Sequence, residues 1–559
     1  MNHPLLQKAS IVFTPTAYGT STLNSIKPVY TLGTELVTNG TFDTDSNWTK
    51  GTGWTISGGV ASCDGTQSST STLNTTVGIS GITNKKVKLS FDIKNYQAGS
   101  LTVTLEGTGG NEFTGLNSDG VYEIEATSTD SLPKLLFNAN SSFIGSVDNA
   151  SIKLVTDADF DFSRSTTATR VNEAGLIEEV AAHIPRIDFL SGVGVSLNEW
   201  QSTNTCTYSN DFTQGDIFGG SAAPNAVNSV ITATSTTSPD GTNNGWKLTD
   251  NNDSSSGTVQ MAYYSVDVTS GDSNTFSIFV KKGSLDFAYI VTGGFDSTAN
   301  ATSYFNISTG VVTVAAANHK GVKIEDYGNG WYRISVANRT TTDVKGAFTV
   351  GMSEASGANT AGTRDGTKFM YMFGVQAEAE DDTDVDYFLT SYIPTSGATF
   401  TRIKDKTIDS GNSDLINSPE GVLYINLAGN ARKFVSTRRI SLSDGTNDNA
   451  VRFDFGTVED RITMRVRVGG ANVTTETNSS YNISEFHKYA IQWKENDFKI
   501  YIDGVEVHTD TTGSSFPANT LDRLNLASYA EGSNIEAKIK CVAVFKEILT
   551  DAELVTLTS

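Results

Sequence analysis

Strict alternation of apolar and polar residues is the feature that most constrains how this chain folds. In Lys86–Asn95 (KVKLSFDIKN), the apolar residues Val87, Leu89, Phe91 and Ile93 alternate with Lys, Ser or Asp. A period of two places these sets on opposite faces of a β-strand. The same pattern recurs in LTVTLEG (101–107), NTFSIFVKKG (274–283) and WYRISVANRT (331–340). We therefore predict an all-β protein of antiparallel sandwiches, with one face of each strand in a core.

Local turn and cap signals sharpen this prediction. In Phe498–Thr509 (FKIYIDGVEVHT), the pair Asp503-Gly504 separates two alternating runs and predicts a hairpin with a type I′ turn. We expect Val505 and Val507 to return to the face of the first run. Near the end of the chain, Thr550 precedes Glu553 by three residues, which predicts a capping box and a short helix. A second short helix is predicted over 172–182 (NEAGLIEEVAA).

Composition and charge exclude several classes of partner. The formal net charge of −22 would repel phosphate backbones and anionic lipid headgroups, so we expect no nucleic acid and no membrane insertion. No apolar run approaches the ~20 residues of a membrane span, and the first residues lack the apolar core of an export signal. Cys63, Cys206 and Cys541 are too scattered to suggest a metal site or a disulfide framework, so we expect buried thiols.

The length of 559 residues predicts several domains, because one core rarely organises so long a chain. Composition shifts and turn-rich stretches suggest six parts. They are an N-terminal segment (1–32), a first sandwich (33–156), a connector (157–202), a second sandwich (203–402), a linker (403–419) and a third sandwich (420–559).

Two motifs at the ends of the first sandwich resemble those of jelly-roll carbohydrate-binding modules of the CBM4/CBM9-like group. The residues that carry this likeness are Leu36, Val37, Asn39, Gly40, Phe42, Asp43 and Trp48, then Val147, Asp148 and Ile152. The resemblance implies a structural calcium ion, for which Asp148 is the best candidate ligand. Asp43 is a second candidate and stands where the family usually has Glu. We expect no other cofactor.

Aromatic side chains are the candidates for glycan binding, because sugar rings stack on them. We single out Trp48, Trp54 and Tyr96 in the first sandwich. Trp54 lies between turn glycines and is expected to be the most exposed. The alternative is that these aromatic residues belong to the core, which is also the interpretation that we favour for Trp331 and Trp493.

Six segments between Asp157 and Arg402 resemble, in order, a block found in phage tail-fibre and other phage structural proteins. They are FSRSTTATRVNEAGLIEEV, IPRIDF, TCTYSNDF, NGWYRIS, FGVQAEA and TSYIPTSGATFTR. The resemblance implies that 1–32 and 157–202 form one attachment region into which the first sandwich is inserted. By analogy, 208–212 and 373–378 would be the first and last strands of the second sandwich. We expect 390–402 to be a joint rather than a catalytic loop.

The third sandwich resembles the LamG/concanavalin A-like jelly roll. The matching stretches are HKYAIQWKENDFKIYIDGVEVH (487–508) and VAVFKEILTDAEL (542–554), in which His487 falls on the common histidine of that family. The resemblance implies a domain that binds glycans, binds proteins or packs against a partner, and the fold does not choose among these.

Catalytic motifs are missing from the sequence, so we expect no enzymatic activity. There is no GxSxG, HExxH, CxxC or P-loop motif, and the five histidines are scattered. The acidic run 378–386 (EAEDDTDVD) suggests either a carboxylate pair for glycoside cleavage, calcium ligands or, as we favour, a solvated loop.

These observations favour a non-enzymatic structural component of a tailed-phage virion, a tail or head fibre or a decoration protein that adheres to host-surface glycans. The expected partners are other virion proteins and those glycans, and the family suggests a homotrimer. Such a protein is assembled in the host cytoplasm and released by lysis. The alternative is a secreted or cell-surface glycan-binding protein or glycoside-hydrolase accessory protein. The sequence leaves the position on the particle and the glycan open.

Overall fold

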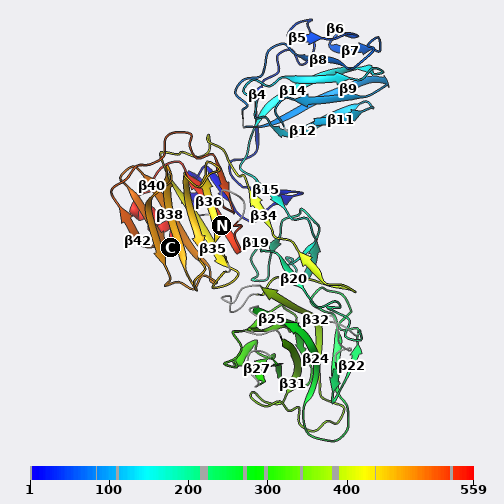
Figure 1. The fold of residues 1–559 in the computed structure, drawn as a ribbon, viewed down its shortest axis with the longest axis vertical. Helices are drawn as coiled ribbons and strands as arrows, with labels where there is room; N and C mark the ends of the chain where they lie inside the picture. The colour runs from blue at the N-terminus through cyan, green and yellow to red at the C-terminus, as the bar shows by residue number, and fades with distance from the viewer. Residues whose placement is uncertain are drawn as a thin grey trace. The chain divides into compact units, whose positions relative to one another are not determined.

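The computed structural model describes residues 3–83, 85–108, 112–214, 225–268, 273–294, 300–339, 344–380, 389–434, 436–528 and 533–559. The chain forms two compact units: Lys27–Asp157, and Met1–Ile26 together with Ala158–Ser559. Antiparallel sheets account for almost all of the regular structure (Figure 1). The all-β, multidomain sandwich prediction is confirmed. Within the described ranges, no helix is long and apolar enough to cross a membrane.

The unit Lys27–Asp157 is a two-layer sandwich. One sheet has the order β11 (Glu112–Leu116), β10 (Leu101–Leu105), β13 (Leu135–Ala139), β8 (Ser71–Thr75), β5 (Trp48–Lys50). The other has the order β12 (Gly120–Thr127), β9 (Lys86–Ala98), β14 (Ile144–Thr156), β7 (Val60–Asp64), β6 (Trp54–Ser57), with β4 (Thr31–Glu35) paired to β14. The apolar residues of the alternating runs fill the space between the sheets, and each contributes about 1.5–3 kcal/mol by burial.

The second sandwich lies within the larger unit. One sheet has the order β21 (Asn225–Val227), β24 (Val259–Val268), β31 (Val344–Ser353), β26 (Phe287–Gly293), β27 (Ala301–Asn306), β28 (Val311–Val314). The facing sheet has the order β22 (Ser229–Ala233), β23 (Trp246–Asp250), β32 (Phe369–Glu380), β25 (Ser273–Lys282), β30 (Trp331–Arg339), β29 (Gly321–Asp326). Residues 373–378 do lie in the last strand. The prediction of a first strand over 208–212 is wrong, because Tyr208 forms only an isolated bridge with Ser396.

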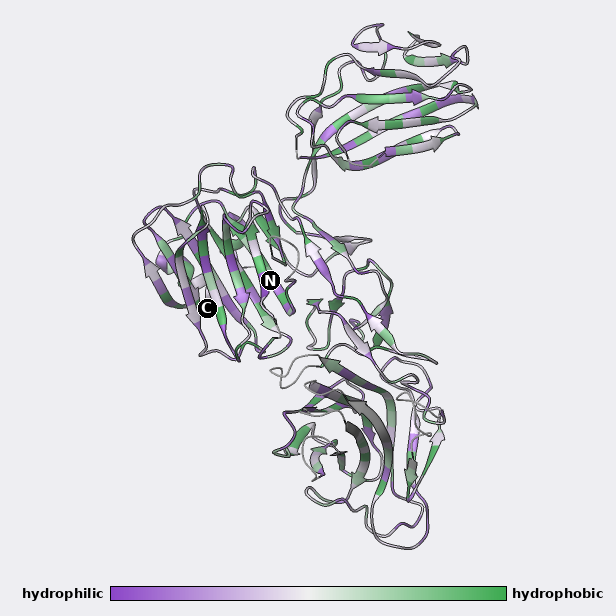
Figure 2. Cartoon of the chain, viewed as in Figure 1, coloured by the Kyte–Doolittle hydropathy of each residue, from purple (hydrophilic) through white to green (hydrophobic). Residues whose placement is uncertain are grey.

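The third sandwich also has two antiparallel sheets. The larger sheet has the order β18 (Ile187–Asp188), β19 (Val195–Asn198), β44 (Ala537–Phe545), β35 (Glu420–Gly429), β40 (His487–Lys494), β41 (Phe498–Ile502), β42 (Val505–Asp510). The smaller has the order β39 (Ala471–Asn478), β38 (Ile462–Val468), β37 (Ala450–Phe455), β36 (Arg438–Ser443), β43 (Arg523–Asn525). Polar and apolar residues alternate along many of these strands (Figure 2).

The N-terminal segment and the connector contribute strands to this third sandwich. Strand β1 (Ile11–Phe13) and strand β19 both pair with β44. The 3-10 helix η1 (Pro4–Lys8) and helix α1 (Asp551–Thr558) supply Leu6, Leu554 and Leu557 to one apolar cluster on the outer face of the larger sheet. Short sheets complete the connector: β2 (Tyr18–Gly19), β3 (Thr22–Leu23), β15 (Phe160–Ser163) and β34 (Lys406–Ile408); β16 (Ala168–Val171) and β17 (Ile177–Val180); β20 (Ser202–Asn204) and β33 (Phe400–Arg402).

Most of the local predictions are confirmed. Asp503 and Gly504 both have positive φ, as a type I′ turn requires, and Thr550 and Glu553 form the capping box of α1. Val505, however, is exposed. The three cysteines are buried free thiols.

The helix predicted over 172–182 is wrong. The Asn172 side chain accepts hydrogen bonds from the backbone N–H groups of Ala174 and Leu176, which closes a turn at Gly175 instead of opening a helix. Ile177 and Val180 then enter strand β17 as buried residues.

A network of buried charges occupies the joint that includes 390–402. Arg164 and Arg186 both pair with Asp405, and Arg186 also pairs with Glu199 at 2.7 Å. Arg402, at the end of the joint segment, is 3.4 Å from the same glutamate. All five side chains are at most 4% exposed. The joint is therefore held by ion pairs that water hardly reaches.

The acidic run 378–386 lies mostly outside the described residues. Its first residue, Glu378, is buried and accepts hydrogen bonds from the hydroxyls of Ser202 and Thr390. These contacts give Glu378 a structural role at the end of the second sandwich.

Candidate functional site

The two candidate tryptophans of the first sandwich lie in its core. Trp48 is 5% exposed and donates to the backbone oxygen of Asn39, and Trp54 is 4% exposed and donates to that of Ser71. The expectation that Trp54 is exposed is wrong. Gly51 lies so close to β8 that an added Cβ would be 2.4 Å from the Ser71 hydroxyl, and the Trp54 backbone N–H donates to the Gly51 oxygen, so this turn holds Trp54 beside β8. Neither ring offers a face for a sugar to stack on.

Tyr96 is the one candidate aromatic of this sandwich that keeps part of its surface in solvent. Its side chain is half-buried, and its hydroxyl donates to the backbone oxygen of Gly99 at 3.0 Å. Trp331 and Trp493 are buried, as expected.

The residues around Asp148 do not fit a calcium ion. One oxygen of the Asp148 carboxylate accepts from the Lys94 ammonium at 2.6 Å, and the other accepts from the Asn149 backbone N–H. Asp43 accepts from the Thr41 hydroxyl. No group of three or more His, Cys, Asp or Glu side chains suited to a metal occurs in the described part of the chain. Lys94 supplies the positive charge that a calcium ion would bring to Asp148.

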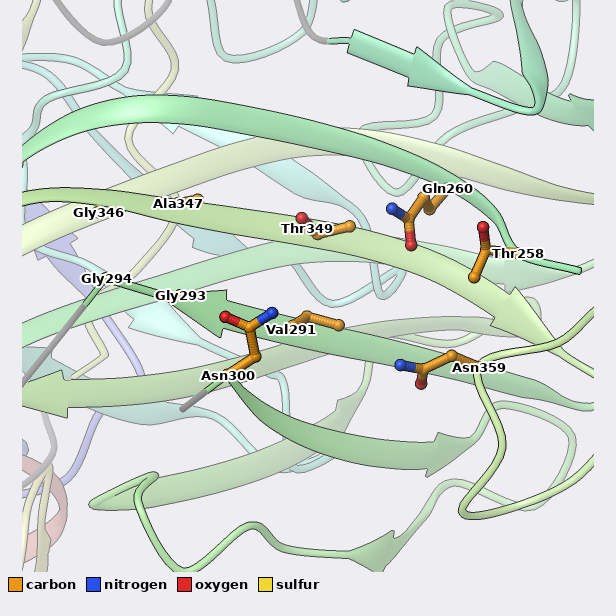
Figure 3. Close-up of a pocket in the computed structure, with 10 residues that line it drawn as sticks. All are labelled: Thr258, Gln260, Val291, Gly293, Gly294, Asn300, Gly346, Ala347, Thr349 and Asn359. Atoms are coloured by element: carbon orange, nitrogen blue, oxygen red, sulfur yellow. The ribbon is translucent and has the colours of Figure 1, made fainter. Parts of the chain in front are cut away.

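A pocket of about 600 Å³ lies on the outer face of the β24–β31–β26–β27 sheet of the second sandwich. Figure 3 shows its lining side chains gathered over neighbouring strands, with Asn359 reaching in from the loop after β31. The lining consists of Thr258, Gln260, Val291, Gly293, Gly294, Asn300, Gly346, Ala347, Thr349 and Asn359. The core residues of the same strands point the other way, so the pocket is built on a rigid, fully packed sheet.

One cross-strand row supports this pocket. The register aligns Gln260 with Gly351, Gly351 with Tyr289, and Tyr289 with Tyr304. Because Gly351 has no side chain, the Tyr289 ring lies across its strand, where an added Cβ would be 2.2 Å from the ring. The Tyr289 hydroxyl then reaches the Gln260 amide oxygen at 3.0 Å, and the Tyr304 hydroxyl reaches that of Asn359 at 2.5 Å.

These contacts decide what the pocket presents to a ligand. Each amide oxygen is held by a tyrosine hydroxyl, so the NH₂ groups of Gln260 and Asn359 remain as donors. The Thr349 hydroxyl and the Asn300 amide have no hydrogen-bond partner within the described residues and offer both donors and acceptors. Among the described residues, the lining contains no charged side chain. Such a set suits a neutral ligand rich in hydroxyl groups.

A serine–histidine contact nearby is enclosed in the protein. Ser303 lies 2.6 Å from Nδ1 of His319, whose Nε2 contacts the Thr292 hydroxyl. Ser303 is 0% and His319 7% exposed, and burial lowers the pKa of His319 to about 4. The imidazole is therefore neutral near pH 7, and this pair faces the interior rather than a substrate.

A second cavity, of about 750 Å³, lies beside the connector. Its main charged group, Arg170, is paired with Glu178 at 2.6 Å and lies 5.2 Å from the Tyr18 ring centroid. His487, the histidine shared with the LamG-like family, likewise has structural partners: Nδ1 lies 2.5 Å from the Asp503 carboxylate and steadies the type I′ turn.

Sequence reasoning missed the pocket because Thr, Asn and Gln are common throughout this chain and follow no motif. The glycines carried a signal. Gly293 and Gly351 interrupt strand-like runs, and a glycine in a strand marks a bulge or a close approach of another group.

Comparison with known proteins gives a match for the C-terminal sandwich. Residues 424–555 match the sequence profile of the concanavalin A-like lectin/glucanases superfamily. No curated protein matches the chain.

Several solved structures are similar to part of the chain. A CBM40 module of the Ruminococcus gnavus IT-sialidase is 14% identical, with a TM-score of 0.23, over 27% of this chain and 94% of the module. Domain 4 of AbnA, a GH43 arabinanase from Geobacillus stearothermophilus, is 9% identical, with a TM-score of 0.23, over 31% of this chain and 83% of that one. Mouse laminin α1 domains LG4-5 are 12% identical, with a TM-score of 0.17, over 52% of this chain and 84% of that one.

Proposed function

We propose that this chain is a non-enzymatic structural component of a tailed-phage virion, and that it adheres to host-surface glycans through the pocket of its second sandwich. The pocket carries the proposal. The amides of Gln260 and Asn359 are held in place by the Tyr289 and Tyr304 hydroxyls, so these two side chains need little ordering when a ligand binds.

The ligand class follows from the lining. The hydroxyl groups of a sugar both donate and accept hydrogen bonds. The described lining offers uncharged donors and acceptors that match them. The described lining residues include no carboxylate or histidine that could act as a general acid or base, which supports adhesion over glycoside cleavage. The lectin/glucanase profile match of residues 424–555 supports a carbohydrate-binding role for the chain as a whole.

The virion assignment rests on the ordered segments between residues 157 and 402 that resemble phage structural proteins. The first two and the last of these segments build the connector and the joint, and their arginines Arg164, Arg186 and Arg402 are buried rather than presented to a substrate. A homotrimer and a position on a tail or head fibre belong to the same proposal. The alternative, a secreted or cell-surface glycan-binding accessory protein, is favoured by the superfamily match, because that superfamily includes glucanases.

The pocket is tested by binding of purified protein to a panel of neutral bacterial polysaccharides and to whole cells. Thr349→Val removes one hydroxyl from the floor, and we expect about fivefold weaker binding for one lost hydrogen bond. Thr232→Val makes the same chemical change on exposed strand β22 of the facing sheet and serves as the control. Asn300→Ala removes the amide at the exposed rim.

Weakened binding for Thr349→Val and Asn300→Ala, with Thr232→Val unchanged, supports the proposal. Equal binding by all variants refutes the pocket, and shortened polysaccharide products refute the non-enzymatic role. Mass spectrometry of density-purified phage particles that encode the chain tests the virion assignment separately. Absence of the protein from those particles refutes the structural role.

A further inference from the structure

The outer face of the smaller sheet in the third sandwich carries a group of arginines around one aspartate. In the register, Arg439 is opposite Asp454, Arg452 is opposite Arg465, and Arg467 is opposite Ala450. Their neighbours in each strand, such as Val451 and Phe453, point into the core between the sheets. The period of two therefore places all four guanidinium groups on the opposite, outer face, which we call the arginine face (Arg439, Arg452, Arg465 and Arg467).

Asp454 is the shared partner of three of these arginines. Its carboxylate is 2.5 Å from Nε of Arg439, 3.3 Å from Nη2 of Arg452 and 3.7 Å from Nη2 of Arg465. Arg467 contacts the Asn472 amide instead. Within the described residues, no second carboxylate forms an ion pair with any of the four arginines.

The arginine face therefore holds three uncompensated positive charges on a chain whose net charge is −22. The pKa of Arg452 is lowered, mainly by burial and also by the positive charges of Arg439 and Arg465. The negative charge of Asp454 opposes this shift but does not cancel it. Like charges crowded on a partly buried surface are costly unless an anion joins them.

Hydrogen-bonding groups on this face are also left unsatisfied. Arg452 is 5% exposed, yet its Nε has no hydrogen-bond partner in the described structure, and the same is true of the buried Nε atoms of Arg465 and Arg467. Buried donors without partners are rare in proteins. The exposed hydroxyls of Thr475 and Thr477 lie on the neighbouring strand β39, Thr475 directly opposite Arg465.

We propose that the arginine face is a second glycan site, which binds an anionic group (carboxylate, sulfate or phosphate) of an acidic host-surface polysaccharide. The guanidinium groups take the anion by charge-assisted, forked hydrogen bonds. The threonine hydroxyls of β39 take neighbouring sugar hydroxyls. This inference rests on the proposed adhesive function, but it uses a different domain and a different ligand chemistry from the neutral pocket.

The test compares the binding of the full-length protein to matched oligosaccharides. One set carries uronic acid carboxylates, a second carries the same sugars with the carboxylates reduced to alcohols, and further sets carry sulfate or phosphate. Arg465→Gln removes one partly exposed charge of the face, and Arg461→Gln makes the same change at an exposed position of the same sandwich. We expect Arg465→Gln to weaken acidic binding at least tenfold, Arg461→Gln to leave it unchanged, and added salt to weaken it in both.

A second variant gives a result that a structural role would not produce. Asp454→Asn removes the carboxylate that competes with the ligand, so a folded Asp454→Asn protein is expected to bind the acidic oligosaccharides more tightly than the unmodified protein. Equal affinity for acidic and reduced oligosaccharides overturns the inference, as does equal weakening by Arg461→Gln. Free sulfate or phosphate that binds as tightly as the oligosaccharides refutes the polysaccharide as the ligand.

The failure of this inference is distinguishable from the failure of the proposed function. Neutral binding that depends on Thr349 but shows no preference for acidic sugars refutes only the arginine face. No binding of neutral or acidic glycans refutes both sites. Acidic binding that depends on Arg465, in a protein whose neutral glycan binding is absent or unchanged by Thr349→Val, supports the arginine face and refutes only the pocket.

Discussion

The buried charges at the joint make a sharp stability prediction. Asp405 accepts from Nη1 of Arg164 at 2.9 Å, from Arg186 and from the Glu199 backbone N–H at 2.9 Å, and its side chain is fully buried. Asp405→Asn keeps the size of the side chain but removes its negative charge. The three buried guanidinium groups of the network, those of Arg164, Arg186 and Arg402, then remain with one carboxylate, Glu199, in place of two.

Removing one partner of a buried ion pair costs about 3–5 kcal/mol, because the charge left behind has lost its compensation and remains out of water. With a urea m-value of about 3 kcal/mol per M, the unfolding midpoint of the larger unit is expected to fall by about 1 M or more. Urea unfolding followed by intrinsic fluorescence measures this shift. The transition of the separate unit Lys27–Asp157 is expected to stay in place and provides an internal reference.

Asp286→Asn is the matched control, because Asp286 is an exposed residue whose ion pair with Lys282 lies at the surface. Such surface pairs contribute about 0–1 kcal/mol. A midpoint shift for Asp405→Asn no larger than that of Asp286→Asn would show that water or other groups compensate the arginines, and the reasoning from burial would fail.

Three further predictions follow from individual residues. Burial lowers the pKa of His319 from 6.5 to about 4, so its neutral form is expected to contribute about 3 kcal/mol of stability above pH 6.5, which is lost as the pH falls to 4. Urea titrations across this range measure the loss. It is expected to be about 3 kcal/mol smaller for His319→Gln, and equal losses in the two proteins would contradict the prediction. Trp54→Ala is expected to destabilise the unit Lys27–Asp157 by about 3–5 kcal/mol, whereas Tyr96→Ala is expected to destabilise it much less. Thermal melts measure both losses, and a larger loss for Tyr96→Ala would contradict the placement of Trp54 in the core. Because Lys94 already neutralises Asp148, the melting temperature of this unit is expected to be the same with calcium and with a chelator, and a rise with calcium would show a metal site.

Local sequence signals predicted the local structure well. Alternation in 86–95 gave strand β9 with its apolar face buried, and the Asp503-Gly504 pair gave the turn, because both depend on neighbouring residues only. The helix predicted over 172–182 does not form, and the cause is again a local contact. A single side chain, that of Asn172, closes a turn that helix propensity does not anticipate.

The sequence did not predict which distant strands pair with each other. Strands β1 and β19 are three and four residues long, and nothing local indicates that both pair with β44, hundreds of residues away. The candidate sites were hidden for a related reason. Gln260 and Tyr289 come together, as do Arg452 and Arg465, only through the register of neighbouring strands. Arg465 and Arg467 alternate with apolar residues in 464–468 (MRVRV), but the single aspartate of the arginine face does not follow from spacing.

The joint and the two proposed sites predict how affinity depends on the length of the glycan. The pocket of Thr349 and the arginine face of Arg465 both belong to the larger compact unit, in which buried ion pairs of Asp405 hold the connecting segments. Two linked sites bind a spanning ligand with a high effective concentration, which falls when the link between them loosens, whereas short fragments bind each site independently. For a polysaccharide with neutral and acidic sugars, affinity is expected to rise steeply above one chain length. Asp405→Asn is expected to blunt this rise without changing the affinity for short fragments. A gradual rise that is identical in both proteins would refute the coupling of the sites through the joint.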